Sequence, residues 1–351
     1  MKRRKLAALS ATVVLLAACG GGDDTEPEDT GAETEGTTEG DDGEAADDGE
    51  AAGGEDWPDE LVLGLVPSQD MDKLVEDADV LGELLSEELG IPVSTNITDD
   101  YTALVVAMGT GQADIGMFGP IALAQSVDQS DAVPILQSVR RGAATYHTQW
   151  FTNDPDRFCE DEPVTAENAE GYEFLYCNGT DTADAGPVGE DALENIEEGE
   201  TIFFVDEASA SGYYYPATQL QQVAGIDPFG TDIDPQFAGG HPNALQAVLR
   251  GDGAVGVSFD DARNVVIEDE PAVAEEIVVF AWSTEIPNDG ISVSGELPAD
   301  LVQAITDAFL ALAADEEGNA ALFEVYEIED LVEVDTAAID EARTVAENFG
   351  D

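Results

Sequence analysis

The chain has 351 residues, and its 78 Asp and Glu side chains outnumber its 11 Lys and Arg side chains, which gives a formal net charge of −67. Such a charge repels nucleic acid and anionic lipid surfaces, so no nucleic acid is expected as a partner.

The first 19 residues have the pattern of an export signal. Residues 2–5 are all basic, residues 6–18 form an apolar run too short to span a bilayer stably, and Cys19 follows Leu16-Ala17-Ala18. This order is typical of a bacterial lipobox, so residues 1–18 are interpreted as a lipoprotein signal peptide and Cys19 as the acylated N-terminus. A plain signal peptide with an incidental cysteine is the alternative, and the export route, Sec or twin-arginine, stays open. We expect an extracytoplasmic protein, lipid-anchored at the outer face of the cytoplasmic membrane.

An acidic segment, residues 19–56, follows the signal. It contains no basic residue, and 16 acidic side chains fall within residues 23–56. Such a composition cannot bury a core, and its like charges repel one another. We therefore expect a disordered tether. Removal of the signal takes four of the 11 basic residues and leaves seven against 78 acidic ones, a net charge of about −71.

Cys159 and Cys177 remain once Cys19 is assigned to lipid. An even pair in an oxidising compartment favours a disulfide, with two free thiols as the alternative. No metal site is expected, because no further Cys or His lies near them in the sequence.

About 295 residues remain from Trp57 onward, enough for two compact lobes. Short β-prone runs alternate with helix-forming segments, and this rhythm predicts a parallel sheet with helices on both faces. The expected strands are 61–66, 93–97, 114–118, 172–176, 201–205, 255–258 and 277–283. The expected helices are 72–89, 100–110, one from 120, one from 211, 242–249, 297–313 and 335–349. We assign 57–147 to lobe one, 148–255 to lobe two and 256–351 to the return into lobe one, with a ligand cleft between the lobes.

A serine-rich turn stands before one expected helix. Ser209 and Ser211 can cap the helix, and their hydroxyls and nearby backbone N–H groups can converge on an oxyanion, while Gly212 permits close approach. An ordinary helix cap is the alternative. His241 precedes another helix and can donate to an anion while changing charge near neutral pH, or it is simply a surface residue.

Several segments, in this order and spacing, resemble the phosphate, phosphite and phosphonate solute-binding proteins of ABC transporters. They are 101–108 (YTALVVAM), 111–120 (GQADIGMFGP), 209–213 (SASGY), 239–241 (GGH), 259–263 (FDDAR) and 283–289 (STEIPND). The resemblance covers nearly all of residues 60–350. It implies a type II periplasmic-binding-protein fold, an α/β protein whose two lobes close around the ligand and present it to an ABC permease and its ATPase.

The resemblance also implies which side chains bind the ligand. Phosphorus-bound oxygens are expected at Ser209, Ser211 and Gly212, with the Tyr213 N–H. His241 is expected to contact the ligand, although Pro242 replaces the acid that follows this histidine in the family. Tyr101, Tyr146 and neighbouring Thr148 are expected as further donors; either tyrosine could instead be a half-buried core aromatic.

An acidic pair, Asp260 and Asp261, follows the expected strand 255–258, and the resemblance directs Asp261 or Asp260 into the cleft. A carboxylate beside an oxyanion suits a ligand that keeps a proton or carries an ammonium group. A solvated acidic pair is the alternative. No arginine is required in such a cleft, since hydroxyls, helix N-termini and N–H groups can bind the anion.

Catalysis is not expected. The sequence has no nucleophile elbow, no metal-ligand cluster, no phosphate-loop motif and no cleft lysine for imine chemistry, so we assign no catalytic residue, cofactor or metal. The prediction is a monomeric binding lipoprotein that delivers a phosphorus oxyanion to an importer. The same fold serving a sensor kinase, and a surface adhesion lipoprotein, are the alternatives.

Overall fold

The computed structural model describes residues 54, 56–183, 185–228 and 230–349. The predicted signal peptide, the acylation at Cys19 and almost all of the predicted tether lie outside these residues. Within the described part of the chain, no helix combines the length and the apolar character needed to cross a membrane.

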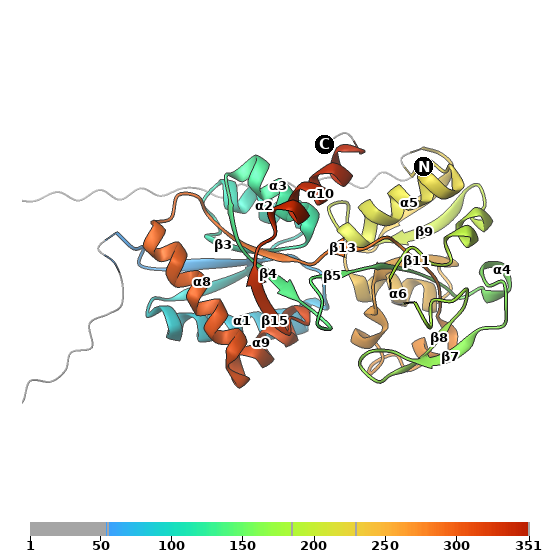
Figure 1. The fold of residues 1–351 in the computed structure, drawn as a ribbon, viewed down its shortest axis with the longest axis horizontal. Coiled ribbons are helices and arrows are strands. Elements are labelled where there is room, and N and C mark those ends of the chain that lie inside the picture. The colour runs from blue at the N-terminus through green and yellow to red at the C-terminus, as the bar shows by residue number, and fades with distance from the viewer. Residues whose placement is uncertain (1–53, 55, 184, 229, 350–351) are drawn as a thin grey trace, which may run out of the picture. The chain divides into compact units, whose positions relative to one another are not determined.

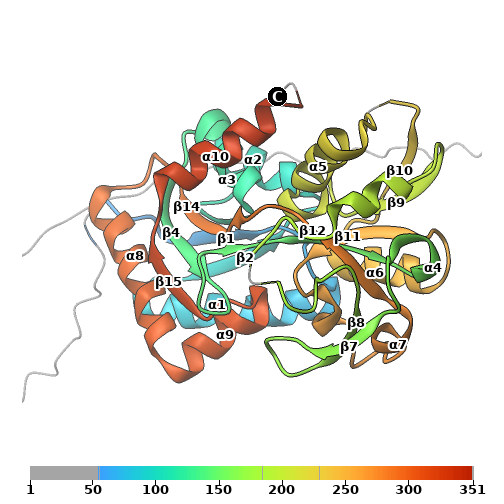
Figure 2. The ribbon, with the colours of Figure 1, turned by 45° about the vertical axis from the view of Figure 1, so that its right-hand side comes forward.

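The first half of the fold is a six-stranded sheet in the order β15-β4-β14-β3-β1-β2. Its strands are β1 (Leu61–Leu65), β2 (Val93–Ile97), β3 (Ile115–Phe118), β4 (Val133–Val139), β14 (Gly290–Val293) and β15 (Asp330–Glu333). Helices α1 (Met71–Leu89), α8 (Ala299–Ala314) and α9 (Glu316–Tyr326) pack together on one face, and α2 (Tyr101–Gly109), α3 (Pro120–Ser130) and α10 (Thr336–Glu347) lie on the other (Figure 2).

The second half is a seven-stranded sheet in the order β10-β9-β11-β6-β12-β8-β7. Its strands are β6 (Thr148–Thr152), β7 (Val164–Glu167), β8 (Glu173–Tyr176), β9 (Glu200–Phe204), β10 (Ile233–Phe237), β11 (Val255–Phe259) and β12 (Val278–Trp282). Its helices are α4 (Pro155–Phe158), α5 (Tyr215–Ala224), α6 (His241–Leu249) and α7 (Val273–Glu276), with the short helical turns η1 (Glu190–Asn195), η2 (Ala210–Tyr214) and η3 (Ala262–Val265).

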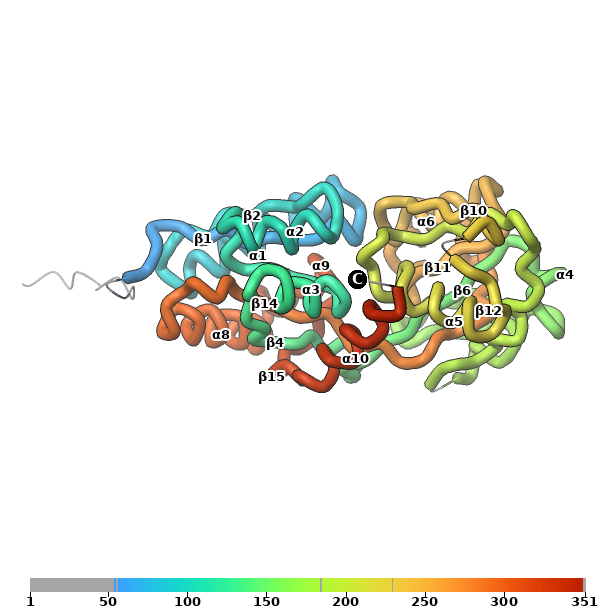
Figure 3. Tube along the Cα trace, turned by 90° about the horizontal axis from the view of Figure 1, so that it is seen from above, coloured from blue at the N-terminus to red at the C-terminus, as the bar shows by residue number. Residues whose placement is uncertain are grey.

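Two short strands join the halves. β5 (Thr145–Tyr146) pairs antiparallel with β13 (Ile286–Pro287), and Figure 1 shows this pair between the two sheets. Seen from above, α10 lies across the same junction (Figure 3). It packs on α3 of the first half, and Phe349, just beyond its end, contacts the rings of Tyr213 and Tyr214 in the second half.

Local signals account for the main elements. The Asp70 carboxylate accepts hydrogen bonds from the N–H groups of Asp72 and Lys73 at the start of α1, and Gly90 ends the helix with φ 70°. The helix turns one apolar face inward, with Leu74, Ala78, Leu81 and Leu85 buried. Cys159 and Cys177, the pair expected to be joined, form a disulfide with an S–S distance of 2.04 Å.

Two expectations about the sheets are wrong. Both sheets are mixed, because the strand that follows each crossing runs against its neighbours: β6 is antiparallel to β11 and β12, and β14 is antiparallel to β3 and β4. The return to the first half was placed after residue 255, but β11 and β12 pair within the second sheet. The chain therefore re-enters the first sheet only at β14, after crossing through β13.

Candidate ligand-binding site

A small cavity lies where loops from both halves meet. Its volume is about 30 Å³, against about 450 Å³ for a neighbouring hollow behind Tyr146 and Phe259. The lining residues are Val66, Ser68, Gln69, Tyr101, Gly119, Arg140, Tyr146, Ser209, Ala210, Ser211, His241, Phe259, Asp289, Tyr326 and Glu327. The cavity in this conformation thus suits only a small ligand.

Strand ends and helix starts bring these residues together. Ser68 follows β1, Gly119 follows β3, Ser209 follows β9 and His241 follows β10. These strands point their carboxyl ends toward the cavity, and α3 and α6 begin there without a side-chain cap. Uncapped N–H groups and the positive end of each helix dipole favour a bound anion at such a place.

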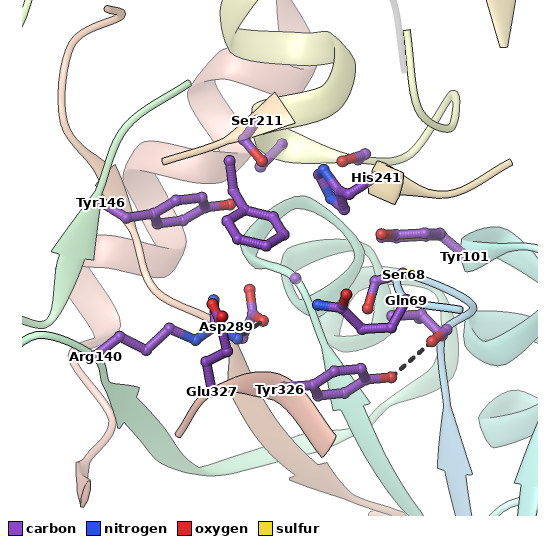
Figure 4. Close-up of a pocket in the computed structure, with 15 residues that line it drawn as sticks. Ser68, Gln69, Tyr101, Arg140, Tyr146, Ser211, His241, Asp289, Tyr326 and Glu327 are labelled. Carbon is purple, nitrogen blue, oxygen red and sulfur yellow. Dashed lines mark hydrogen bonds and ion pairs between the residues drawn. The ribbon is translucent and has the colours of Figure 1, made fainter. Parts of the chain in front are cut away.

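The serine turn lines the cavity as expected, with a different internal arrangement. Ser209 Oγ accepts from the Gly212 N–H at 3.1 Å, which occupies that N–H and leaves the serine O–H available to donate. Gly212 is required by close packing against the strand, since a Cβ there would lie 2.4 Å from Val205 Cβ. Ser211 is 1% exposed and faces the cavity (Figure 4).

Thr148 supports the serine turn from behind and does not line the cavity. Its hydroxyl donates to the Ser211 carbonyl at 3.0 Å, and its N–H donates to Ser283 Oγ at 2.9 Å. The Thr148 hydroxyl, which was expected to donate to the ligand, therefore donates to Ser211 instead.

Both expected tyrosines line the cavity from different elements. Tyr101 is the first residue of α2, and burial raises the pKa of its hydroxyl well above the usual value. Burial and the nearby Asp289 charge also raise the pKa of Tyr146, although hydrogen bonding to Ser211 opposes the change. Figure 4 shows the Tyr146 hydroxyl directed at Ser211. Both hydroxyls stay protonated and can donate to a ligand oxygen.

His241 lines the cavity as a neutral imidazole. Its Nδ1 lies 2.8 Å from Ser258 Oγ, and its ring packs edge-on against Phe259. Burial, together with the Arg140 charge, lowers the pKa of His241 to about 3. The expected change of charge near neutral pH is therefore wrong, because desolvation disfavours the imidazolium. Neutral His241 can still donate one hydrogen bond.

A group of charged residues in the cavity was missed by the sequence analysis. Arg140, at the end of β4, donates from Nη2 to Asp289 Oδ2 at 2.5 Å, and Glu327 also lines the wall. Burial raises the pKa of Glu327, although Arg141 and Arg140 oppose this. One signal was available: two adjacent arginines at the end of a β-prone run are conspicuous in a chain this acidic.

Tyr326 and the segment after β1 were also missed. The Tyr326 hydroxyl donates to the Val66 carbonyl at 2.7 Å, as the dashed line in Figure 4 shows. Ser68 and Gln69 belong to the turn into α1 and line the cavity. Since Tyr326 ends a helix 260 positions from Val66, no local pattern connects them.

Three further expected site residues do not line the cavity. The Gly212 N–H donates to Ser209 Oγ. The Tyr213 ring packs among Phe204, Phe237 and Phe349. Asp261 is 3% exposed. It forms an ion pair with Arg263 at 2.7 Å and accepts from the Tyr176 hydroxyl at 3.0 Å. Burial would raise the pKa of Asp261, but the Arg263 charge lowers it overall. The carboxylate is thus consumed by an internal pair.

Asp260 likewise faces the neighbouring hollow. Its carboxylate lies 3.7 Å from His147 and 3.8 Å from Arg141. The carboxylates that do line the cavity are Asp289, between β13 and β14, and Glu327, at the end of α9, so an acidic group is present there but comes from other segments than expected.

Contacts across the cavity join the two halves. The His241 N–H donates to the Ser68 carbonyl at 3.1 Å, and the Asp206 carboxylate accepts from the Tyr101 N–H. No group of three or more metal-ligating side chains occurs among the described residues. Two mixed α/β lobes joined by paired crossing strands, with a small polar cavity enclosed between them, define a two-lobed binding protein of the type II periplasmic class.

Comparison with known proteins identifies the family. The family model for the ABC transporter phosphonate periplasmic substrate-binding protein matches residues 63–338, and the chain belongs to this family. The phosphate-import protein PhnD of Mycolicibacterium smegmatis is 25% identical over 292 residues, which cover 80% of this chain and 73% of that protein. The chain is accordingly an extracytoplasmic substrate-binding protein of the phosphonate ABC transporter family, whose members are binding proteins and not enzymes.

Solved structures share the fold. PhnD1 from Prochlorococcus marinus in complex with methylphosphonate superposes with a TM-score of 0.68 at 16% identity, covering 83% of this chain and 98% of that one. The binding protein component of an ABC phosphonate transporter from Pseudomonas aeruginosa has a TM-score of 0.65 at 17% identity, covering 82% and 85%. Both confirm the predicted type II fold.

Proposed function

We propose that the cavity binds a small phosphorus oxyanion, a phosphonate, phosphite or phosphate, in a form that keeps one proton. Hydroxyls of Tyr101, Tyr146, Ser209 and Ser211 offer donors, together with neutral His241. Each charge-assisted hydrogen bond to such an anion contributes about 1.5–3 kcal/mol. No net positive charge is needed in the cavity, which agrees with the acidity of the chain.

The charged residues of the cavity wall, Arg140, Asp289 and Glu327, favour a ligand that keeps one proton. Arg140 can attract one ligand oxygen, while the carboxylates of Asp289 and Glu327 repel a fully deprotonated anion and can accept a hydrogen bond from a ligand O–H. A phosphorus anion with one remaining O–H can place an oxygen near Arg140 and donate its O–H to a carboxylate. Sulfate has no such proton at neutral pH and is expected to bind more weakly.

The single observation that carries the proposal is the composition of the cavity wall. Residues on both sides of the crossing strands contribute to a space of about 30 Å³. A ligand of that size touches both lobes only when they are closed, so capture by lobe closure follows. The closed form is the one that a permease would recognise.

Calorimetric titration tests this proposal. The probes are phosphate, phosphite, methylphosphonate, aminoethylphosphonate and sulfate, added to the mature chain carrying Cys19→Ser in high salt. We expect micromolar or tighter binding of at least one phosphorus anion, weaker sulfate binding, and loss of binding in Ser211→Ala. The control is Ser130→Ala. The Ser130 hydroxyl donates to Val105 O, and Ser130 does not line the cavity. A folded protein that binds none of the five would contradict the proposal.

We also propose that Cys19 carries the lipid and that residues 19–56 hold the binding lobes away from the membrane. Two acyl chains suffice for stable anchoring. Expression of the full chain with a radiolabelled fatty acid tests this, and the label should be present in the wild type and absent in Cys19→Ser. Equal labelling of the two would contradict the anchor.

A further inference from the structure

Arg141 lies at the tip of a tight turn beside the cavity. The turn joins β4 to β5, with Arg140 N–H donating to Ala143 O at 3.0 Å and Ala143 N–H donating to Arg140 O at 2.9 Å. Arg141 and Gly142 both have positive φ, 50° and 70°, as a two-residue hairpin turn requires. Arg140 lines both the ligand cavity and the neighbouring hollow, whereas Arg141 lines only the hollow. Of these two adjacent residues, only Arg140 therefore reaches the ligand cavity.

Glu170 lies at the tip of a second turn, which belongs to the other lobe. The turn joins β7 to β8 of the seven-stranded sheet, and Asn168 N–H donates to Tyr172 O at 2.8 Å. The Asn168 side chain fixes the turn further, since its Oδ1 accepts from the N–H groups of Glu170 and Tyr172, and its Nδ2 donates to Asn264 Oδ1 at 2.8 Å. Glu170 is thus presented by a well-braced loop.

The two tips meet across the cleft. Arg141 Nε donates to Glu170 Oε1, and Arg141 Nη1 donates to the Asp260 carbonyl at the end of β11. On the side of the first lobe, Arg141 Nη2 lies 3.9 Å from Glu327 Oε2. The side chains of Arg141 and Glu170 are 23% and 26% exposed, so the pair is less screened by salt than a fully exposed one.

We infer that Arg141 and Glu170 form a latch that holds the two lobes closed around the ligand without touching it. The inference rests on the proposed function. Arg141 is a positioning residue: its turn also carries Arg140, so contact with the ligand and contact with the opposite lobe are made by neighbouring residues. An interaction present only in the closed form stabilises that form, which slows ligand release more than it speeds capture.

A double-mutant cycle tests the latch in the mature chain carrying Cys19→Ser. Methylphosphonate and phosphate are titrated into the wild type, Arg141→Gln, Glu170→Gln and the double variant, and release rates are measured by stopped flow. We expect Glu170→Gln to weaken binding about three- to tenfold, mainly through faster release. Arg141→Gln should weaken binding more, because it also loses Asp260, and the double variant should resemble Arg141→Gln.

Glu200→Gln is the matched control. Glu200 pairs with Arg157 at 2.8 and 2.9 Å inside the second lobe, so its loss removes the same kind of ion pair without a contact between lobes. We expect its ligand affinity to stay within twofold of the wild type. The exchanged pair, Arg141→Glu with Glu170→Arg, should bind more tightly than Arg141→Glu alone, which a merely structural role of either side chain would not produce.

Small-angle X-ray scattering without ligand supplies a readout that does not depend on binding. Loss of the latch should increase the radius of gyration of Glu170→Gln relative to the wild type and to Glu200→Gln. A wild type that binds neither probe would overturn the proposed function, while the scattering comparison would still decide the latch. Unchanged scattering, or affinities in which the two single losses simply add, would overturn the latch.

Discussion

Arg140 Nη2 lies 2.5 Å from Asp289 Oδ2, which places a partly buried ion pair in the wall of the candidate ligand cavity. The Arg140 Nε atom itself is buried, and the described residues offer it no hydrogen-bond partner. Asp289 therefore holds the guanidinium through Nη2, while the Nε–H can still donate a hydrogen bond. Together the two side chains present one positive and one negative group, and under the proposed function this arrangement would distinguish a protonated oxyanion from a bare one.

Asp289→Asn should relax the discrimination against sulfate. Without the carboxylate, repulsion of a fully deprotonated anion falls, and the charged acceptor for a ligand O–H is replaced by the weaker, neutral amide oxygen, while the amide NH2 can donate to a bare anion. A hydrogen bond to a charged group contributes about 1.5–3 kcal/mol. We expect the ratio of methylphosphonate to sulfate affinity to fall at least tenfold, measured by calorimetry at neutral pH. Asp128→Asn, which breaks a surface pair with Arg343 of 2.7 Å, should leave the ratio unchanged. An unchanged ratio in Asp289→Asn would argue against the role of Asp289.

Thr148→Val should weaken ligand binding although Thr148 does not line the cavity. The substitution removes the hydroxyl that donates to the Ser211 carbonyl, at a cost of about 1 kcal/mol or more. We expect a five- to tenfold loss of affinity, measured by titration with methylphosphonate. Thr152→Val removes a similar bond, from Thr152 Oγ1 to Ala254 O at 2.7 Å. It should lower the free energy of unfolding while binding stays within twofold, and a similar loss of binding in both variants would refute the positioning role.

His241 should make the folded state less stable in acid. Burial lowers the pKa of the folded imidazole from 6.5 to about 3, so between these values the unfolded chain binds more protons than the folded chain. The stabilisation is fully present above about pH 6.5 and is lost as the pH falls toward 3, by at most about 1.4 kcal/mol per pH unit. Urea unfolding between pH 4.5 and 7.5 should show a steeper loss for the wild type than for His241→Gln. Parallel curves would contradict the buried neutral state.

Asp261→Asn should cost stability and spare binding. The variant leaves Arg263 buried without its partner, and breaking such a pair costs about 3–5 kcal/mol. Arg263 also stacks on the rings of Phe174 and Tyr176, at 4.3 and 4.5 Å, so it cannot easily turn to solvent. We expect a lower thermal midpoint and, for the protein that remains folded, an affinity within twofold of the wild type. A large loss of affinity at unchanged stability would restore Asp261 to the ligand site.

Much of the fold follows from local patterns. The strand expected at 93–97 is β2, the helix expected at 72–89 is α1 and the helix expected at 335–349 is α10, with small differences at the ends. Apolar periodicity and capping residues predict these elements, and both signals depend only on residues that are close in the sequence. Strands without such signals were missed. β10, for example, contains Pro235, which an edge strand tolerates and a propensity argument rejects.

Some residues of the candidate site could likewise be predicted from local sequence, and others could not. The serine turn and the starts of α2 and α6 were recognised because a strand, a short turn and a helix adjoin in the sequence, so their N–H groups and hydroxyls must converge. Arg140, Asp289 and Tyr326 come from three distant segments and meet only through the order of strands in the first sheet. That order depends on hydrogen bonds between strands far apart in the chain, which no local pattern encodes.

The sequence by itself determined the two-lobed α/β class, the family and the serine-capped helix that faces the cavity, because those properties reside in short, ordered segments. Only the tertiary structure decided which charges enter the cavity and which are consumed elsewhere: Asp261 is neutralised by Arg263, His241 is held neutral by burial, and Arg140 is paired with Asp289. The physical reason is that the protonation and availability of a polar group depend on its solvent exposure and on its partners in space, and folding sets both.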